Sequence, residues 1–277
     1  MIPNLLSIAG SDPSGGAGVQ ADLKTFSALG CYGMAVITGL TAQNTRGVRA
    51  VHAIPGDFVA AQLDAVFDDI RVDAVKIGML ANSDVIDAVA KVLADRRPPY
   101  VVLDPVMVAK SGDRLLTVDA VARLRDVLLP HVDLITPNLP EAADLLGVPE
   151  ATSESGMRDQ LRDLLDLCPA VLLKGGHLGG PSSPDLLIVT GDSDPTRLTT
   201  ARLETTSDHG TGCTLSSATA ALRPQRDDWT SAVIDAKTYL TDALLAADQL
   251  TVGGGHGPVH HFHAWFNQAK EPGRHSA

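Results

Sequence analysis

The segment at residues 209–218, His-Gly-Thr-Gly-Cys-Thr-Leu-Ser-Ser-Ala, has the clearest potential for chemistry. Two glycines flank Thr211, Cys213 follows them, and an Ala- and Ser-rich run predicts a helix over residues 215–222. Amides at a helix N-terminus lack intrahelical acceptors and readily bind anions. Glycine lets the backbone approach a ligand, and the helix field favours a thiolate over a thiol at Cys213. The segment could therefore hold a phosphate beside a proton acceptor.

A purely structural interpretation of the same segment is equally open at this point. Gly-Thr-Gly before a helix can be only a tight turn, and a lone cysteine is more often a small buried apolar residue than a reactive group. The elements around the segment must therefore decide between the two.

Those elements alternate between apolar strands and amphipathic helices. Continuous Val-, Ile- and Leu-rich strands, each followed by a helix, indicate a parallel sheet covered by helices on both faces. The predicted strands are residues 4–9, 34–41, 73–79, 100–103, 133–136 and 171–173, with an edge hairpin at 186–189 and 198–203. The predicted helices are residues 19–29, 59–70, 85–93, 118–129, 141–146, 157–167, 215–222, 229–250 and 260–268. No repeat, linker or shift in composition appears, so we expect one domain over residues 1–268 and a flexible tail at 269–277.

Polar residues gather where these strands end. Ligands of open α/β sheets bind in a crevice beyond the carboxyl ends of the strands. We therefore expect the strand ends to bring together residues that are far apart in the sequence: Gly10, Gln43, Gly78, Met79, Asp104, Asn138 and Lys174. The first strand, its Gly-rich loop and its helix also suggest a dinucleotide site. However, the G-x-G-x-x-G spacing is absent and no acidic residue ends the second strand, which excludes a Rossmann dehydrogenase.

Composition narrows the class of protein. Of the 277 residues, 44% are hydrophobic and 20% are charged, which is typical of a soluble globular protein. The 22 basic and 33 acidic residues give a formal charge of -11, so a nucleic acid is not expected as a partner. The N-terminus resembles no signal peptide, no apolar run reaches membrane-spanning length, and Cys31, Cys168 and Cys213 form no Cys-x-x-Cys pair. We therefore expect a cytoplasmic protein without a membrane partner.

The motifs, taken in order, resemble the ribokinase-like superfamily of small-molecule kinases, and within it the hydroxymethylpyrimidine and phosphomethylpyrimidine kinases of thiamine biosynthesis. The resemblance rests on AGSDPSGGAGVQADLKTF, TAQNT, KIGML, DPVMVAKSGDRLL, TPNLPEA, LLKGG, HGTGCTLSSA and GHGPV, which span nearly the whole chain. Each motif alone is weak, whereas their combination is specific. The superfamily usually carries aspartate where Cys213 stands, and cysteine occurs in this branch and in related pyridoxal kinases.

The resemblance implies a fold, a reaction and partners. The fold would be a three-layer α/β/α domain with a central, mostly parallel sheet and no separate lid domain. The enzyme would transfer phosphate from Mg-ATP to the hydroxymethyl group of 4-amino-5-hydroxymethyl-2-methylpyrimidine, and then add a second phosphate to the monophosphate. A homodimer is also implied.

The same resemblance gives roles to the candidates for phosphate chemistry. Cys213 would be the catalytic base, with a thiol pKa lowered by the helix N-terminus from about 8.5 toward the working range. Lys174 would bind the ATP phosphates, although a solvated lysine in a turn is the structural alternative. The anion hole would be formed by the amides of Gly210, Thr211 and Gly212.

The acidic candidates would serve the nucleotide and its metal. Asp104, Asn138 and Glu141 would form the magnesium and phosphate site, partly through water, because Mg²⁺ prefers oxygen ligands. Asn138 would also contact the nucleotide, together with Lys174 and Thr211. Asn-x-x-Glu is equally a helix capping box, and the two roles can coexist.

Recognition of the ring would fall to residues nearer the N-terminus. The Gln43 amide offers a donor and an acceptor side by side, which suits the ring nitrogen and amino group of an aminopyrimidine. Met79 and Val106 would form apolar walls against the ring, and Gly10 and Asp22 would also line the pocket. Asp22 could instead be a solvated helix residue, and His209 is expected to cap or position the glycine loop.

Two features depart from this picture or compete with it. Ser207 and Asp208 stand where the family commonly has Asn-Thr, which adds a negative charge beside the anion hole. Four histidines at residues 256–263 could suggest a metal, but a Gly-Pro turn followed by a surface helix is the favoured interpretation. A pyridoxine or pyridoxal kinase of the same fold is the nearest alternative function, and a non-catalytic pyrimidine sensor is a weaker one.

Overall fold

The computed structural model describes residues 1–107, 116–203 and 205–266. Its strands are β1 (Asn4–Ser11), β2 (Tyr32–Asn44), β3 (Gly47–Ala53), β4 (Ala74–Ile77), β5 (Val101–Leu103), β6 (Leu134–Ile135), β7 (Ala170–Lys174), β8 (Ser182–Val189) and β9 (Thr196–Ala201). Its α-helices are α1 (Gly18–Ala28), α2 (Gly56–Phe67), α3 (Ser83–Arg96), α4 (Val118–Arg123), α5 (Leu139–Leu146), α6 (Glu154–Leu165), α7 (Thr211–Leu222), α8 (Trp229–Leu245) and α9 (His263–Phe266).

The strands form one nine-stranded sheet in the order β3-β2-β1-β4-β5-β6-β7-β8-β9. The six strands from β2 to β7 in this order run parallel, whereas β3, β8 and β9 are each antiparallel to their neighbours. Ile8 of β1 lies beside Val36 on one side and Ile77 on the other. The parallel centre therefore aligns the carboxyl ends of six strands along one edge.

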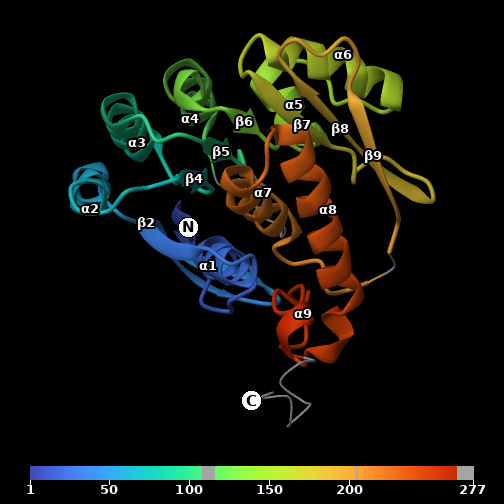
Figure 1. Ribbon diagram of the computed structural model, residues 1–277, viewed down its shortest axis with the longest axis horizontal. Coiled ribbons are helices and arrows are strands. Elements are labelled where there is room, and N and C mark those ends of the chain that lie inside the picture. Colours follow the sequence, from blue (N-terminus) through green and yellow to red (C-terminus); the bar gives the residue numbers. More distant parts are fainter. Residues whose placement is uncertain (108–115, 204, 267–277) are drawn as a thin grey trace.

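Helices cover both faces of the sheet, which gives the three-layer α/β/α architecture (Figure 1). Adjacent residues of one strand enter opposite cores: Leu6 packs with the helices α2 to α6, and Leu5 packs with α1, α7 and α8. Both side chains are fully buried. Because both faces of the parallel strands are covered, their sequences are continuously apolar, as expected.

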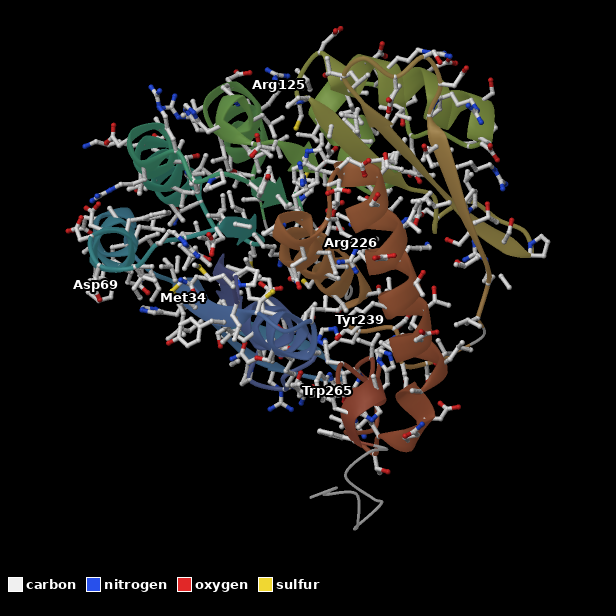
Figure 2. All side chains as sticks on the ribbon, in the orientation of Figure 1. Met34, Asp69, Arg125, Arg226, Tyr239 and Trp265 are labelled. Atoms are coloured by element: carbon white, nitrogen blue, oxygen red, sulfur yellow. The ribbon has the colours of Figure 1, made fainter. Side chains whose placement is uncertain are left out.

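The C-terminal segment packs against the beginning of the chain. Trp265 donates a hydrogen bond from its indole to the Ala28 carbonyl at the end of α1 (3.1 Å). The Tyr239 hydroxyl of α8 donates to the His261 carbonyl (2.7 Å). Figure 2 labels Tyr239 near α8 and Trp265 near α9, whereas Asp69 and Arg125 lie at the periphery.

The order of strands and helices is as predicted, including the β8–β9 hairpin, with differences at some ends. Strand β3 was missed, because its residues are exposed on both faces and lack an apolar alternation. The helix predicted at 118–129 continues beyond α4 as a π-helical turn (Leu124–Leu128) and a 3-10 turn (Leu129–His131). The long helix predicted to residue 250 ends at Leu245.

The end of the helix predicted at 260–268, like the tail at 269–277, lies outside the described residues. The extent of the domain over residues 1–268 stays a prediction. Within the described ranges, no helix combines the length and hydropathy needed to cross a membrane.

Candidate functional site

A cleft of about 680 Å³ lies at the carboxyl ends of the parallel strands. All the strand-end residues expected to converge line it: Gly10, Gln43, Gly78, Met79, Asp104, Asn138 and Lys174. The glycine turn before α7 closes another side of the cleft with Gly210, Thr211, Gly212 and Cys213. The parallel topology therefore brings together motifs that are up to about two hundred residues apart in the sequence.

The glycine turn places the N-terminus of α7 against the loop that follows β1. Gly210 is the N-cap, with φ 78°, and a Cβ atom there would lie 1.8 Å from the Gly16 carbonyl oxygen. Only glycine fits both the left-handed backbone and this close approach. The helix begins at Thr211 rather than at 215 as predicted, so the amides of Thr211, Gly212 and Cys213 form its first turn. These amides lack intrahelical acceptors and face an anion site.

Cys213 lines the cleft and is partly exposed, but its electrostatic setting differs from the prediction. Burial and the carboxylates of Asp104 and Asp22 raise the pKa of the Cys213 thiol to about 11, although Lys76 acts in the opposite direction. The expected lowering of the Cys213 pKa is therefore wrong. Desolvation of the thiol is the largest cause of the raised pKa, and the two acids add to it.

Opposite the glycine turn, one ammonium group faces two carboxylates. Lys174 Nζ lies 2.8 Å from Asp104 Oδ1 and 3.9 Å from Glu141 Oε2. Burial and the neighbouring Asp104 raise the pKa of Glu141 to about 7, against the effect of Lys174. Burial also acts to raise the pKa of Asp104, but Lys174 and Lys76 outweigh it and lower that pKa. The cluster thus holds more negative than positive charge when both acids are ionised.

Asn138 and Glu141 form the capping box that the sequence left open as an alternative. Asn138 Oδ1 accepts from the Glu141 amide (2.9 Å), and Glu141 Oε2 accepts from the Asn138 amide (2.8 Å), at the start of α5. Both residues also line the cleft. The cap therefore fixes the orientation of Glu141 toward Lys174 instead of competing with a role in the site.

The opposite end of the cleft is apolar and carries Gln43. Met79 and Val106 line it, and a Cβ atom on Gly10 would lie 2.4 Å from Met79 Cε, so glycine is needed to admit the methionine. Gln43 lies within β2, at the irregularity between Ala42 and Gln43, not after the strand as predicted. These residues give the cleft apolar surface together with one amide group, the combination that binds a largely apolar ring with one polar edge.

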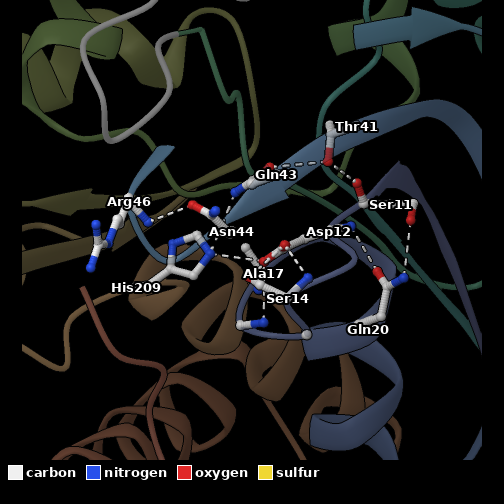
Figure 3. Close-up of polar contacts among 12 residues, drawn as sticks. Ser11, Asp12, Ser14, Ala17, Gln20, Thr41, Gln43, Asn44, Arg46 and His209 are labelled. Carbon is white, nitrogen blue, oxygen red and sulfur yellow. Dashed lines mark hydrogen bonds and ion pairs between the residues drawn. The ribbon is translucent and has the colours of Figure 1, made fainter. Parts of the chain in front are cut away.

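A hydrogen-bond network that the sequence did not reveal lies behind Gln43 (Figure 3). His209 Nε2 lies 2.8 Å from Asp12 Oδ2 and 3.5 Å from Gln43 Nε2. Burial acts to raise the pKa of Asp12, but hydrogen bonds from His209 and Ser14 outweigh it and lower the pKa to about 2. An aspartate two residues before a serine in a Gly-rich loop is a turn signal that could have pointed to Asp12.

Asp22 is the predicted site residue that does not line the cleft. It is fully buried, pairs with Lys76 Nζ (2.8 Å), and accepts hydrogen bonds from the Ser7 and Ser217 hydroxyls (2.6 Å each). The prediction that Asp22 lines the substrate pocket is therefore wrong, because its carboxylate is fully buried and already paired within the protein. Lys76 lines the cleft and was missed, although a lysine within an apolar buried strand signals a buried partner.

The histidine-rich segment also differs from expectation. His260 and His261 are buried instead of lying on a surface helix, and His261 Nε2 contacts the Thr214 hydroxyl of α7 (3.1 Å). Among the described residues, no group of three or more His, Cys, Asp or Glu side chains could hold a metal ion by itself. Asp208 lines the cleft and pairs with His256 Nδ1 (2.9 Å), which offsets the extra negative charge when His256 is protonated.

Comparison with known protein sequences identifies one family of kinases. The Phosphomethylpyrimidine kinase family model matches residues 12–260. The chain is 60% identical over 264 residues to the hydroxymethylpyrimidine/phosphomethylpyrimidine kinase of Escherichia coli K12, covering 95% of this chain and 98% of that protein. It is 53% identical to the Rhizobium meliloti protein of the same name, covering 94% and 97%.

Solved structures extend the similarity to two kinds of kinase. The pyridoxal kinase from Staphylococcus aureus in complex with ADP superposes with a TM-score of 0.87 at 33% identity, covering 96% of this chain and 95% of that one. The phosphomethylpyrimidine kinase from Clostridium difficile 630 gives 0.76 at 41% identity, covering 88% and 99%. With its three-layer fold and its family motifs gathered around one cleft, the chain belongs to the phosphomethylpyrimidine kinase family.

Proposed function

We propose that the protein uses ATP to phosphorylate 4-amino-5-hydroxymethyl-2-methylpyrimidine, and then its monophosphate to the pyrophosphate, in thiamine biosynthesis. The observation that carries the proposal is that the N-terminal amides of α7 and the Gln43 amide line one cleft. The first can bind a phosphoryl group and the second can recognise a ring edge. Relatives at 53–60% identity carry both kinase names, and multifunctional relatives are named for thiamine biosynthesis.

In this proposal, the charged end of the cleft binds the nucleotide. Lys174 pairs with the ATP phosphates, with Asn138 and Thr211 beside it, and the amides of Thr211 and Gly212 stabilise the transferring phosphoryl group. The neighbouring pyridoxal kinase structures contain ADP or AMP-PCP, which supports ATP as the donor. The sugar and base of the nucleotide would extend toward solvent from this end.

The residues at this end also fit a magnesium ion. Asp104 and Glu141 are buried carboxylates facing a single ammonium, so a divalent cation would balance the excess charge. They would hold it together with Asn138, largely through water and nucleotide oxygens, because their inner oxygens already accept protein hydrogen bonds. Such an ion would neutralise charge on the transferred phosphate.

Cys213 is the proposed acceptor of the substrate hydroxyl proton. Its thiol must lose a proton to act as a base, and its pKa is raised to about 11, so turnover should rise with pH above neutrality. Gln43 would bind the ring nitrogen and amino group, while Met79, Val106 and Gly10 pack against the ring. The homodimer and the cytoplasmic location expected from the sequence remain part of the proposal.

A pyridoxal kinase is the second candidate, because structures of the S. aureus pyridoxal kinase are similar over nearly the whole chain. A non-catalytic sensor is disfavoured, since Cys213, Lys174 and both acids all line the cleft. The deciding experiment measures ADP release with Mg-ATP and, side by side, the hydroxymethylpyrimidine, its monophosphate and pyridoxal. We expect the highest kcat/KM with the two pyrimidines. Preference for pyridoxal would favour the second candidate, and no turnover of either pyrimidine would overturn the proposal.

A further inference from the structure

The network behind Gln43 constrains the direction in which its amide can point. The Asp12 carboxylate is surrounded by donors: Oδ1 accepts from the Ser14 amide and hydroxyl, and Oδ2 accepts from the amides of Gly16 and Ala17. A carboxylate that accepts four such bonds is ionised and can only accept. His209 Nε2, 2.8 Å from Oδ2, must therefore carry a hydrogen, in the neutral ring or the cation alike.

That hydrogen decides the contact with Gln43. Gln43 Nε2 lies 3.5 Å from His209 Nε2, so an N–H donor would face another N–H donor. At the other end of the amide, Gln43 Oε1 lies 3.2 Å from the Thr41 hydroxyl. That hydroxyl has one hydrogen for two acceptors, and the Ser11 carbonyl at 2.8 Å is the nearer one. The amide nitrogen of Gln43 thus faces another N–H donor, and the amide oxygen faces a hydroxyl whose single hydrogen has a nearer acceptor. Rotating the amide by half a turn lets Gln43 Nε2 donate to the Thr41 hydroxyl. It also places the Gln43 oxygen, an acceptor, beside the single Nε2–H of His209, which the oxygen then shares with Asp12.

We infer that His209, held by Asp12, is a positioning residue that fixes the Gln43 amide with Oε1 toward His209 and Nε2 toward Thr41. Each end of the amide then keeps one unused bond: an oxygen lone pair near His209 and an N–H near Thr41. A ring held by this pair must place its amino group at the His209 end and its ring nitrogen at the Thr41 end. His209 therefore determines the orientation in which an aminopyrimidine ring binds in the cleft.

The tight packing of the histidine supports this role. A Cβ atom on Gly16 would lie 2.4 Å from His209 Cδ2, so the ring fits against a glycine of the β1–α1 loop. The His209 amide also donates to the Gly257 carbonyl (3.0 Å), which fixes the backbone just before the glycine turn. Figure 3 shows dashed lines from the imidazole to the labelled Asp12 and Gln43 side chains. The imidazole is therefore held from both sides before a ligand arrives.

The inference rests on the proposed function for its substrate, but its first test does not. Long-range ¹H–¹⁵N NMR of the full-length protein reports which nitrogens of His209 are protonated, with His209→Gln used to assign the signal. We expect Nε2 to be protonated across pH 6–8. An unprotonated Nε2 would overturn the inference, whether or not the protein phosphorylates a pyrimidine.

The second test uses a double-mutant cycle on kinetics. His209→Ala should raise KM for the hydroxymethylpyrimidine about three- to tenfold, the usual effect of one neutral hydrogen bond, with KM for ATP unchanged. In a Gln43→Ala background, the same change should have almost no further effect. His209→Gln, which can donate to both partners, should recover most of the loss.

Matched controls separate positioning from damage to the fold. His52→Ala removes an exposed histidine of β3 and should leave both KM values and the melting temperature unchanged. The inference fails if His209→Ala raises KM equally with and without Gln43, or if it raises KM for ATP as much as KM for the pyrimidine. Absence of pyrimidine turnover by the wild-type enzyme would instead reject the proposed function.

Discussion

Two lysines, Lys76 within β4 and Lys174 at the end of β7, each pair with a buried aspartate, yet their surroundings are opposite. Lys76 and Asp22 have fully buried side chains, and Asp22 also accepts from Ser7 and Ser217, so this pair is closed within the protein. Lys174 is 16% exposed and shares its charge between Asp104 and Glu141 at the cleft wall. One pair is complete without a ligand, whereas the other leaves negative charge that a metal ion could balance.

The closed pair still bears on the chemistry, because Cys213 lies within the field of both pairs. Ser217 follows Cys213 by one turn of α7, on the same face, and its hydroxyl donates to Asp22. Lys76 lowers the pKa of the Cys213 thiol, while burial, Asp104 and Asp22 raise it. We therefore assign the Asp22–Lys76 pair to the support of α7, and the Lys174 cluster to ligand binding. Four substitutions can test this division.

Cys213→Ala should have the largest effect on kcat, because it removes the proposed base, whose pKa depends on both ion pairs. We expect kcat to fall about a hundred- to ten-thousandfold, the usual contribution of a positioned base, while ATP binding measured by calorimetry survives. Cys213→Asp, the residue usual in the superfamily, should restore part of the rate and abolish its rise with pH above neutrality. Near-normal turnover of the alanine variant would refute the role of the cysteine.

Lys76→Met should chiefly affect folding. It leaves the Asp22 carboxylate buried without its cation, which costs about 3–5 kcal/mol of the free energy of unfolding in comparable buried pairs. Urea denaturation followed by circular dichroism measures this loss. A second change, Asp22→Leu, removes the stranded charge and should recover most of it. A loss below about 1 kcal/mol, the value typical of exposed ion pairs, would show that the Lys76–Asp22 pair is not shielded from solvent.

Lys174→Met is the matched substitution in the Lys174–Asp104 pair. It should affect ATP binding more than stability, the opposite of Lys76→Met. Lys174 is partly exposed, whereas Lys76 is fully buried, so the free energy of unfolding should fall by less than in Lys76→Met. Loss of a charged hydrogen bond to phosphate should raise KM for ATP about ten- to a hundredfold. If Lys174→Met destabilised the protein more than Lys76→Met, the comparison between the two pairs would be wrong.

Glu141→Gln should change the free energy of unfolding least at neutral pH and should appear mainly in the pH dependence of stability. The pKa of Glu141 is raised from 4.5 to about 7 on folding, chiefly by burial. The folded state therefore binds this proton more tightly than the unfolded state does, so its stabilising contribution is present below pH 4.5 and is lost as pH rises toward 7. The difference in unfolding free energy between wild type and Glu141→Gln should fall between about pH 5 and 7. A flat difference would mean that Glu141 is ionised throughout this range.

The sequence was enough to predict the parallel centre of the fold and the place of the site. Buried parallel strands are apolar throughout, so their ends are marked by the first polar residues, and Asp104, Asn138 and Lys174 are found there. Strand β3 was not predicted, because an edge strand exposed on both faces has no alternation of apolar residues. Most of the predicted site residues line the cleft and could thus be predicted from local pattern and topology, whereas Asp22 does not line it, and Lys76 and Asp12, which do, were missed.

Only the tertiary structure decided how these groups are paired and charged. The sequence placed Cys213 at a helix N-terminus, but the balance of burial, Asp104, Asp22 and Lys76 that raises its pKa depends on strands and helices far apart in the chain. The contacts of Asp22 with Lys76, and of His209 with Asp12 and Gln43, likewise join residues separated by 54, 197 and 166 positions. Patterns within the sequence report which residues are buried or lie at a strand end, whereas a hydrogen bond or a pKa depends on atoms a few ångströms away, which packing alone brings there.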